Sequence, residues 1–453
     1  MWVSPRTAKI SLASVFAAAS VGVGLAALPA PANGQATTAA APTTPIEHVV
    51  VIFKENRSYD EYFGRFPGAD GATTATKKDG TVVTLAETPD SVPRDPGHGP
   101  DAFRIDYDGG KMDGFNLERN AYSKTGQPLA LSQMYAGDIP NYWAYANHYA
   151  LADRFFAAWK GASFTNNLYE MAAQAGIYDP TLNGRTVYTI PKFPSGTRSK
   201  YWGCDSPSDT YVRMLEPTTG KLTSMFPCFN FPALPNVLSD NGITWHFYNT
   251  TGVQTVHDPL DALKPVRYDS SLWSKVVPIS QFLSAAADGT LPSVSWIVGS
   301  QLEHPPASTC KGENQTVQYV NTIMNGPDWS STAIFVVWDE WGGFYDHVPP
   351  PQIDAISYGF RVPLIAISPY TKAGSLKDGG SVSSTVYSHE SILKFIEDNW
   401  GLPSMTPADG RANDMMDMFD FSRTPNPKLT LPMRTCPSLT AAAKQLLRTR
   451  PPD

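Results

Sequence analysis

The chain has 453 residues, of which 42% are hydrophobic and 11% aromatic, so it holds enough apolar material for a large core. Its formal net charge is −7 and no run of Lys or Arg is present, which argues against nucleic acid as a partner. The 40 prolines and 34 glycines predict many loops around that core.

The N-terminus reads as a targeting segment. Arg6 and Lys9 precede an apolar stretch over 10–28, and small residues suited to cleavage follow at 30–32, which is the secretory pattern. The alternative is a retained membrane anchor, but the stretch is rich in Ala and only weakly apolar. We expect a secreted protein, extracellular or in the cell envelope. Its parts are a signal peptide (1–32), a flexible Ala/Thr/Pro-rich spacer (33–45), the main domain (46–428) and a C-terminal tail (429–453).

Four cysteines fit an oxidising compartment. Three pairings are possible, and free buried thiols are the alternative to all of them. The simplest pairing joins Cys204 to Cys228 within one loop-rich stretch and leaves Cys310 to pair with Cys436. No C-x-x-C spacing occurs, which argues against a cysteine metal site.

Four apolar runs predict buried strands, at 48–53, 292–298, 333–338 and 363–367. Continuous runs of this kind are typical of parallel strands covered on both faces. Helical periodicity lies between them, at 168–175 and 388–400. The alternation predicts an α/β protein, a three-layer α/β/α sandwich around a central, mostly parallel sheet.

Oxygen-bearing side chains follow two of these strands directly. The run 48–53 leads through Lys54 into Glu55 and Asn56, and the run 333–338 leads into Asp339 and Glu340. The carboxyl ends of parallel strands share one edge of a sheet, where ligands bind. Crowded carboxylates need a cation or protons between them, so the pattern predicts one divalent ion. Ca²⁺, Mg²⁺ or Mn²⁺ fit all-oxygen ligands better than Zn²⁺, which stays a candidate. The alternative is that these acids face solvent in loops.

A segment of small hydroxyl and amide residues, Gly-Ala-Ser-Phe-Thr-Asn-Asn at 161–167, stands just ahead of the helix at 168–175. A helix N-terminus without an acid favours an anion such as phosphate. Ser163 is therefore either a nucleophile held against that anion or an ordinary N-cap, and the local sequence alone favours the cap.

Three histidines lie in predicted loops. His304 follows the strand at 292–298 and is suited to protonate a leaving group. His98 stands in Asp-Pro-Gly-His-Gly, and His347 follows Phe-Tyr-Asp. Taken singly, each is more simply a surface or structural histidine.

Several blocks resemble the signatures of one known family. Residues 55–64, Glu-Asn-Arg-Ser-Tyr-Asp-Glu-Tyr-Phe-Gly, and 338–350, Trp-Asp-Glu-Trp-Gly-Gly-Phe-Tyr-Asp-His-Val-Pro-Pro, are similar to two blocks of the bacterial phosphoesterase family that joins phospholipases C and acid phosphatases. Residues 359–370, 388–393 and 419–421 resemble its later blocks in the same order.

The resemblance implies an alkaline-phosphatase-like α/β fold and a role for each candidate residue. The family's nucleophile block, Gly-Pro-Thr/Ser-x-Pro-Asn, aligns with 161–166 and makes Ser163 the nucleophile, although Ala162 and Thr165 replace both prolines. His304 is then the second catalytic residue. The implied metal ligands are Glu55, Asn56, Asp339 and Glu340, and the expected substrate-binding residues are His98, Asn166 and His347.

We therefore expect a metal-dependent phosphoric ester hydrolase that acts through a phosphoserine intermediate. The chain has no appended lipid-binding module, which tilts the expectation slightly toward an acid phosphatase. The alternative is a phospholipase C that cleaves phospholipid headgroups and touches lipid transiently. A catalytically silent surface protein on the same fold is the second alternative.

Overall fold

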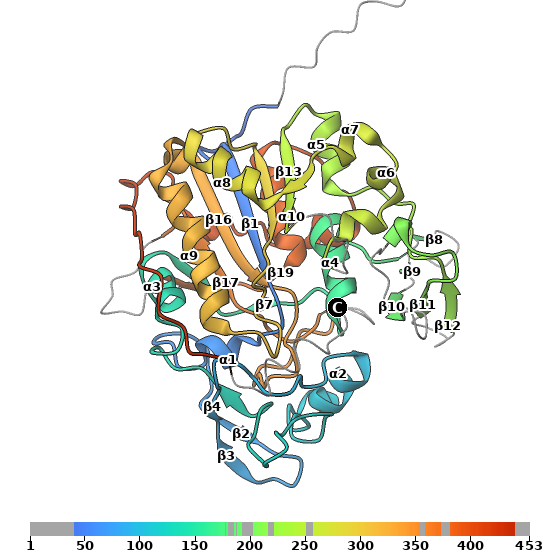
Figure 1. Cartoon of the computed structure of the whole chain (residues 1–453), viewed down its shortest axis with the longest axis vertical. Coiled ribbons are helices and arrows are strands. Elements are labelled where there is room, and N and C mark those ends of the chain that lie inside the picture. The colour runs from blue at the N-terminus through green and yellow to red at the C-terminus, as the bar shows by residue number, and fades with distance from the viewer. Residues whose placement is uncertain are drawn as a thin grey trace, which may run out of the picture. The chain divides into compact units, whose positions relative to one another are not determined.

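A computed structural model of the protein describes residues 40–176, 178–179, 185–186, 188–192, 203–215, 222–250, 257–353, 358–372 and 381–439 (Figure 1). The predicted signal peptide, most of the predicted spacer and the end of the predicted tail lie outside these residues. Within the described ranges, no helix combines the length and apolar character needed to cross a membrane.

An eight-stranded sheet forms the centre of the fold, in the order β14-β13-β15-β1-β16-β17-β6-β18. Its strands are β1 (His48–Lys54), β6 (Ala150–Ala152), β13 (Trp245–Asn249), β14 (Val276–Pro278), β15 (Val294–Val298), β16 (Thr332–Trp338), β17 (Leu364–Ile367) and β18 (Ser381–Ser383). Strand β17 is antiparallel to β16 and β6, and the other pairings are parallel. The predicted α/β class and mostly parallel sheet are confirmed.

Helices cover both faces of this sheet. The longer ones are α2 (Pro100–Tyr107), α3 (Pro140–His148), α4 (Ser163–Ala172), α8 (Ile279–Asp288), α9 (Thr309–Asn325) and α10 (His389–Asn399). In Figure 1, α8 and α9 cross in front of the sheet and α10 lies behind it, with α4 packed against α10. On β16, Phe335 packs on Phe395 of α10, and Trp338 packs on Tyr142 of α3. Three residues apart, these side chains leave opposite faces, as strand geometry requires.

The shorter elements connect and extend these layers. The helices are α1 (Tyr59–Phe63), α5 (Leu234–Asp240), α6 (Lys264–Arg267), α7 (Ser270–Trp273) and α11 (Pro407–Arg411). The strands are β2 (Thr74–Thr76), β3 (Val82–Thr84), β4 (Ala86–Glu87), β5 (Ser132–Gln133), β7 (Phe155–Phe156), β8 (Tyr178–Asp179), β9 (Arg185–Thr186), β10 (Tyr188–Lys192), β11 (Tyr211–Leu215), β12 (Leu222–Met225) and β19 (Tyr387–Ser388). Elements α2, β2, β3 and β4 form a lobe below the end of β1 in Figure 1.

All four predicted strands are present, and two details differ from the sequence reading. Strand β17 runs antiparallel although its apolar run is continuous, because burial on both faces gives the same pattern in either direction. Helix α4 begins at Ser163 and ends at Ala172, earlier than the periodicity at 168–175 indicates. Its first turn is buried throughout, so that turn shows no apolar and polar alternation.

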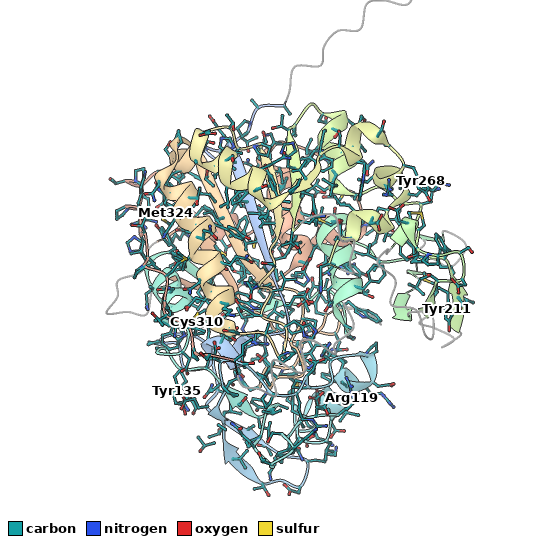
Figure 2. All side chains as sticks on the ribbon, viewed as in Figure 1. Arg119, Tyr135, Tyr211, Tyr268, Cys310 and Met324 are labelled. Atoms are coloured by element: carbon teal, nitrogen blue, oxygen red, sulfur yellow. A yellow bond between two sulfur atoms is a disulfide. The ribbon has the colours of Figure 1, made fainter. Side chains whose placement is uncertain are left out.

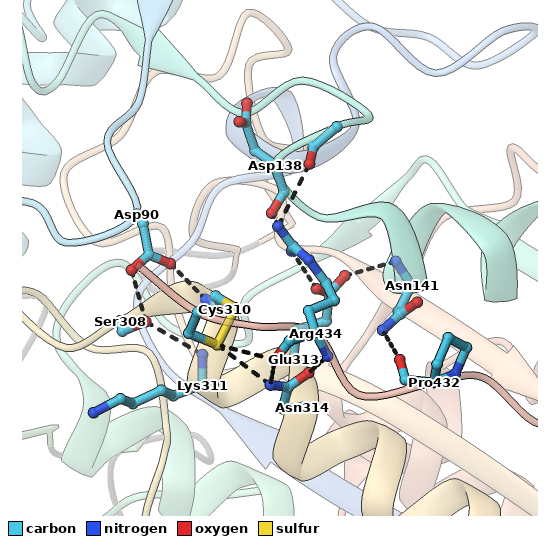
Figure 3. The surroundings of a disulfide bond; sticks show 12 residues. Asp90, Asp138, Asn141, Ser308, Cys310, Lys311, Glu313, Asn314, Pro432 and Arg434 are labelled. Carbon is cyan, nitrogen blue, oxygen red and sulfur yellow. Dashed lines mark hydrogen bonds and ion pairs between the residues drawn. A yellow bond between two sulfur atoms is a disulfide. The ribbon is translucent and has the colours of Figure 1, made fainter. Parts of the chain in front are cut away.

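Both predicted disulfides are present. Cys204 bonds Cys228 and Cys310 bonds Cys436, with Cα–Cα distances of 4.5 Å and 5.5 Å. Figure 2 labels Cys310 among the side chains, and Figure 3 shows its surroundings. There the tail runs beside α9, where Arg434 pairs with Glu313 at 2.6 Å. The second bridge therefore fastens the C-terminal segment to the start of α9.

Candidate active site

The ends of three adjacent parallel strands create the candidate site. Strand β1 lies between β15 and β16, and Lys54 at its end is in register with Trp338. The next residues stay in contact: the Asp339 amide donates to the Lys54 carbonyl at 3.1 Å. The Asn56 amide donates to Asp339 Oδ1 at 2.8 Å. The two acidic pairs predicted from sequence thus adjoin at one edge of the sheet.

Several oxygens at this edge lack a hydrogen-bond partner. Asn56 Oδ1, Asp339 Oδ2 and Glu340 Oε1 are buried and unpaired among the described residues. Burial, and then the charge of Glu55, raises the pKa of Asp339 well above its ordinary value. Burial, and then Asp339, does the same to the pKa of Glu340. Buried carboxylate oxygens without a hydrogen-bond partner favour a hard cation, so this group fits a divalent ion.

Ser163 stands beside these carboxylates. It is the first residue of α4, and the N-cap is Ala162, so the simpler local reading of Ser163 as the cap is wrong. Its side chain is buried, and its Oγ lies 3.3 Å from Glu55 Oε2. Burial and the charge of Glu55 raise the pKa of Asp339, and a hydrogen bond from Ser163 offsets part of that rise. The first turn of α4 carries no acid, which leaves its N–H groups suited to an anion.

His98 and His304 face each other on the same edge. Their ring centroids are 5.5 Å apart. Each Nδ1 donates to a backbone carbonyl, at 2.8 Å to Pro96 and 2.9 Å to Pro305. This leaves each Nε2 for other partners. His98 Nε2 lies 3.3 Å from Asn56 Nδ2 and 3.9 Å from a Glu340 oxygen.

Two groups of His, Asp or Glu side chains bring their ligand atoms within 4.8 Å of one another in the described part of the chain, and neither includes Glu55, Asp339 or Glu340. The first is Asp95, His98 and His304, and the second is Asp60, Asp346 and His347. In the first, both Nδ1 atoms already donate to carbonyls, so they offer no lone pair to a metal. In the second, Arg361 contacts Asp60 at 3.2 Å and Asp346 at 2.9 Å and supplies the positive charge. A cation at the edge with Glu55 and Asp339 stays a prediction.

The other two predicted substrate-binding residues contact the protein itself. Asn166 accepts from the Trp159 amide at 2.8 Å and donates to the Gly161 carbonyl at 3.0 Å. His347 lies 2.6 Å from Asp60 and 3.2 Å from an Asp70 oxygen. A role for Asn166 or His347 in substrate binding stays a prediction.

Sequence reasoning missed two residues at this edge. His257 Nδ1 lies 2.6 Å from Glu55 Oε1. It stands eight positions after the end of β13, so no strand end marks it in the sequence. Burial, and then Asp339 and Glu55, raises the pKa of Glu170 well above its ordinary value. Glu170 stands seven residues after Ser163 in α4, and that two-turn spacing on one helix face could have found it.

The mixed α/β fold, with acidic side chains at adjoining strand ends, is consistent with an enzyme that acts on phosphoric esters. The family model described as "Phosphoesterase family" matches residues 46–403, so the chain belongs to that family. It is a hydrolase of phosphoric ester bonds, and the resemblance seen in the sequence is confirmed.

Several phospholipases C are identical to this chain at about a quarter of the aligned positions. Phospholipase C A of Mycobacterium tuberculosis is 26% identical over 86% of this chain and 81% of its own. The hemolytic phospholipase C of Pseudomonas aeruginosa is 26% identical over 83% of this chain and 56% of its own. Non-specific phospholipase C6 of Arabidopsis thaliana is 23% identical over 90% and 78%. Among solved structures, Ps i-CgsB aligns over 82% of this chain and 75% of its own, with 11% identity and a TM-score of 0.37.

Proposed function

We propose that the protein is a phospholipase C, a phosphodiesterase in which Ser163 attacks phosphorus. One observation carries the chemistry: the Ser163 hydroxyl lies 3.3 Å from Glu55 Oε2, beside Asp339 and Glu340, each of which has a buried oxygen without a hydrogen-bond partner among the described residues. The relatives named above support a phospholipid as the substrate, since each is named a phospholipase C. They support this alternative better than the acid phosphatase that the sequence slightly favoured.

The proposed ligands of one divalent ion are Glu55, Asn56, Asp339 and Glu340. All are buried side chains with oxygen donors, which fits Ca²⁺, Mg²⁺ or Mn²⁺. When bound, such an ion lowers the pKa of a nearby hydroxyl and offsets the charge of a phosphate.

The Ser163 hydroxyl gives its proton to solvent before the attack and regains one after hydrolysis. Its Oγ forms a bond to phosphorus while the bond from phosphorus to the leaving alcohol oxygen breaks. His304 donates its Nε2 proton to that oxygen, so a neutral diacylglycerol departs. His98 and the N–H groups at the start of α4 hold the non-bridging oxygens. Neutral His304 then takes a proton from water, and the water oxygen replaces Ser163 Oγ on phosphorus. The second step releases the phosphorylated headgroup and restores the serine.

The protein is proposed to act outside the cytoplasm. The support is its pair of disulfides, since such bonds persist in oxidising compartments. The predicted signal peptide at 1–32 is part of the same proposal.

The experiment compares p-nitrophenylphosphorylcholine with p-nitrophenyl phosphate, after chelation and after addition of each candidate metal. We expect a higher kcat/KM on the diester, loss of turnover with chelator, and diacylglycerol release from phosphatidylcholine vesicles. Faster turnover of the monoester would instead identify an acid phosphatase. Absence of turnover on both substrates with every metal would identify a silent surface protein.

A further inference from the structure

Glu303, the residue directly before His304, is buried and has an unusual backbone conformation. Its side chain is fully buried, and its backbone is left-handed, with φ of 77°. This conformation is uncommon for a residue other than glycine and persists only where the surroundings fix it. The contacts of Glu303 show what fixes it.

The Glu303 carboxylate lies in a closed set of partners. These are Lys54 Nζ at 2.9 Å, the Tyr62 hydroxyl at 2.6 Å, the Tyr142 hydroxyl at 2.5 Å and Trp338 Nε1 at 3.3 Å. The Glu303 carbonyl accepts from Arg57 at 2.7 Å. Every partner is itself buried, so solvent does not weaken these bonds. We call Glu303 and these five residues the Glu303 cluster.

Members of the Glu303 cluster are the chain neighbours of the proposed site residues. Lys54 precedes Glu55, Arg57 follows Asn56, Trp338 precedes Asp339, and Glu303 precedes His304. Lys54 and Trp338 are also in register across β1 and β16. One carboxylate therefore joins the strand ends that bear the carboxylate ligands to the loop that bears the histidine.

This arrangement fixes the direction of the His304 ring. The residue before it cannot rotate without breaking the Lys54 ion pair and two tyrosine hydrogen bonds. On its other side, His304 Nδ1 donates to the Pro305 carbonyl. With Glu303 and Nδ1 both held, the His304 ring keeps one orientation within its loop.

We infer that Glu303 is a positioning residue for the reaction, holding His304 where it protonates the leaving alcohol. This inference rests on the proposed function. Correct placement matters because general-acid transfer needs the donor within hydrogen-bond reach of the departing oxygen.

The test uses two soluble substrates with the same phosphorylcholine half and different leaving groups. Dihexanoylphosphatidylcholine releases an alkoxide that needs a proton, whereas p-nitrophenylphosphorylcholine releases a phenolate that does not. We expect Glu303→Gln to lower kcat on the first by about 100-fold or less, the low end of a general acid's contribution, and on the second by about threefold at most. His304→Ala should show the same difference between the two substrates, with a larger loss of kcat on dihexanoylphosphatidylcholine than Glu303→Gln.

Glu313→Gln is the matched control. Glu313 is equally buried and accepts from the Asn141 and Tyr142 amides, but no site residue adjoins it in the chain. Its variant should keep both rates within about twofold, even where its melting temperature falls as far as that of Glu303→Gln.

Equal loss of both rates in Glu303→Gln would overturn the inference and make Glu303 a residue of stability only. If that variant fails to fold, the double variant Tyr62→Phe, Tyr142→Phe removes two donors to Glu303 instead. This double variant should also lose more kcat on dihexanoylphosphatidylcholine than on p-nitrophenylphosphorylcholine, by a smaller ratio than Glu303→Gln. A wild-type enzyme inactive on both substrates would refute the proposed function itself, which separates the two failures.

Discussion

Two buried carboxylate clusters arise from the same two sequence blocks, and they differ in counter-charge. The site cluster contains Glu55, Asp339 and Glu340, while the arginine cluster contains Asp60 and Asp346. All five carboxyl groups are buried. Five to seven residues along each block separate a member of one cluster from a member of the other.

The arginine cluster is neutralised by the chain itself. Arg361 is fully buried, and its guanidinium reaches Asp60 at 3.2 Å and Asp346 at 2.9 Å. It also donates to the Asp153 carbonyl at 2.7 Å. In the site cluster, Asp339 Oδ2 and Glu340 Oε1 have no hydrogen-bond partner among the described residues. The site carboxylates have histidines within ion-pair range, His257 at 2.6 Å from Glu55 and His98 at 3.9 Å from Glu340, where the arginine cluster has a permanently charged guanidinium. This difference predicts a structural role for the arginine cluster and a bound cation for the site cluster.

The largest effect is expected at Ser163. Ser163→Ala should lower kcat by about 10⁴-fold, as loss of a nucleophile does, while leaving metal affinity and folding unchanged. Thr165 is the third residue of α4, and Thr165→Ala should stay within about tenfold of the wild-type rate, or 1.4 kcal/mol. Stopped assays followed by mass spectrometry of the trapped phosphopeptide check both. A phosphoryl group found on Thr165 would overturn the assignment.

Arg361→Met should come next, as a loss of stability. Breaking a buried pair typically destabilises by about 3–5 kcal/mol, because the carboxylates keep their burial and lose their partner. Urea unfolding measures it. Arg154→Met is the control, since Arg154 also pairs with a carboxylate, Asp70 at 2.7 Å, but is partly exposed. That change should stay within about 1 kcal/mol. Equal effects of the two changes would contradict the comparison.

Asp339→Asn and Asp346→Asn separate the clusters by metal affinity. Asp339→Asn should weaken binding of Ca²⁺ or Mn²⁺ by at least about 100-fold, the upper range for loss of an outer-shell partner. Asp346→Asn should leave the affinity within about threefold while lowering stability. Calorimetric titration of chelator-stripped protein gives both constants. A loss of metal affinity in Asp346→Asn would instead place the ion with Asp60 and His347.

The smallest effect is a pH dependence at His347. Burial lowers the pKa of His347, but the hydrogen bond and charge of Asp60 outweigh it and raise that pKa above 6.5. Charged His347 therefore stabilises the fold fully below pH 6.5, and this contribution is lost as the pH rises through the raised pKa.

His347→Asn should thus be less stable than the wild type near pH 6.5 and should approach it at higher pH. Urea unfolding between pH 6.5 and 9 tests this. The window lies above the pKa of Asp346, which burial raises to about 6, so that group contributes little to the slope. Parallel pH profiles for the two proteins would rule out the role of Asp60. A raised KM in His347→Asn would support the predicted contact with substrate.

Much of the fold and the acidic residues of the candidate site can be predicted from the sequence. Continuous apolar runs mark β1, β15, β16 and β17 because burial on both faces excludes polar residues. The acidic pairs at 55–56 and 339–340 follow two of these runs directly, and parallel strands bring such ends together. An even cysteine count and a predicted signal peptide indicated disulfides, and the structure contains the pairing that was the simplest of the three possible ones.

The tertiary structure alone decided which charges are already paired. Arg361 and Glu303 reach partners about 240 to 300 residues away, and no local pattern encodes such contacts. The antiparallel direction of β17 and the placement of His257 beside Glu55 were set in the same way. Periodicity reports how deeply a residue is buried, whereas the partner that a buried charge meets depends on how distant segments pack.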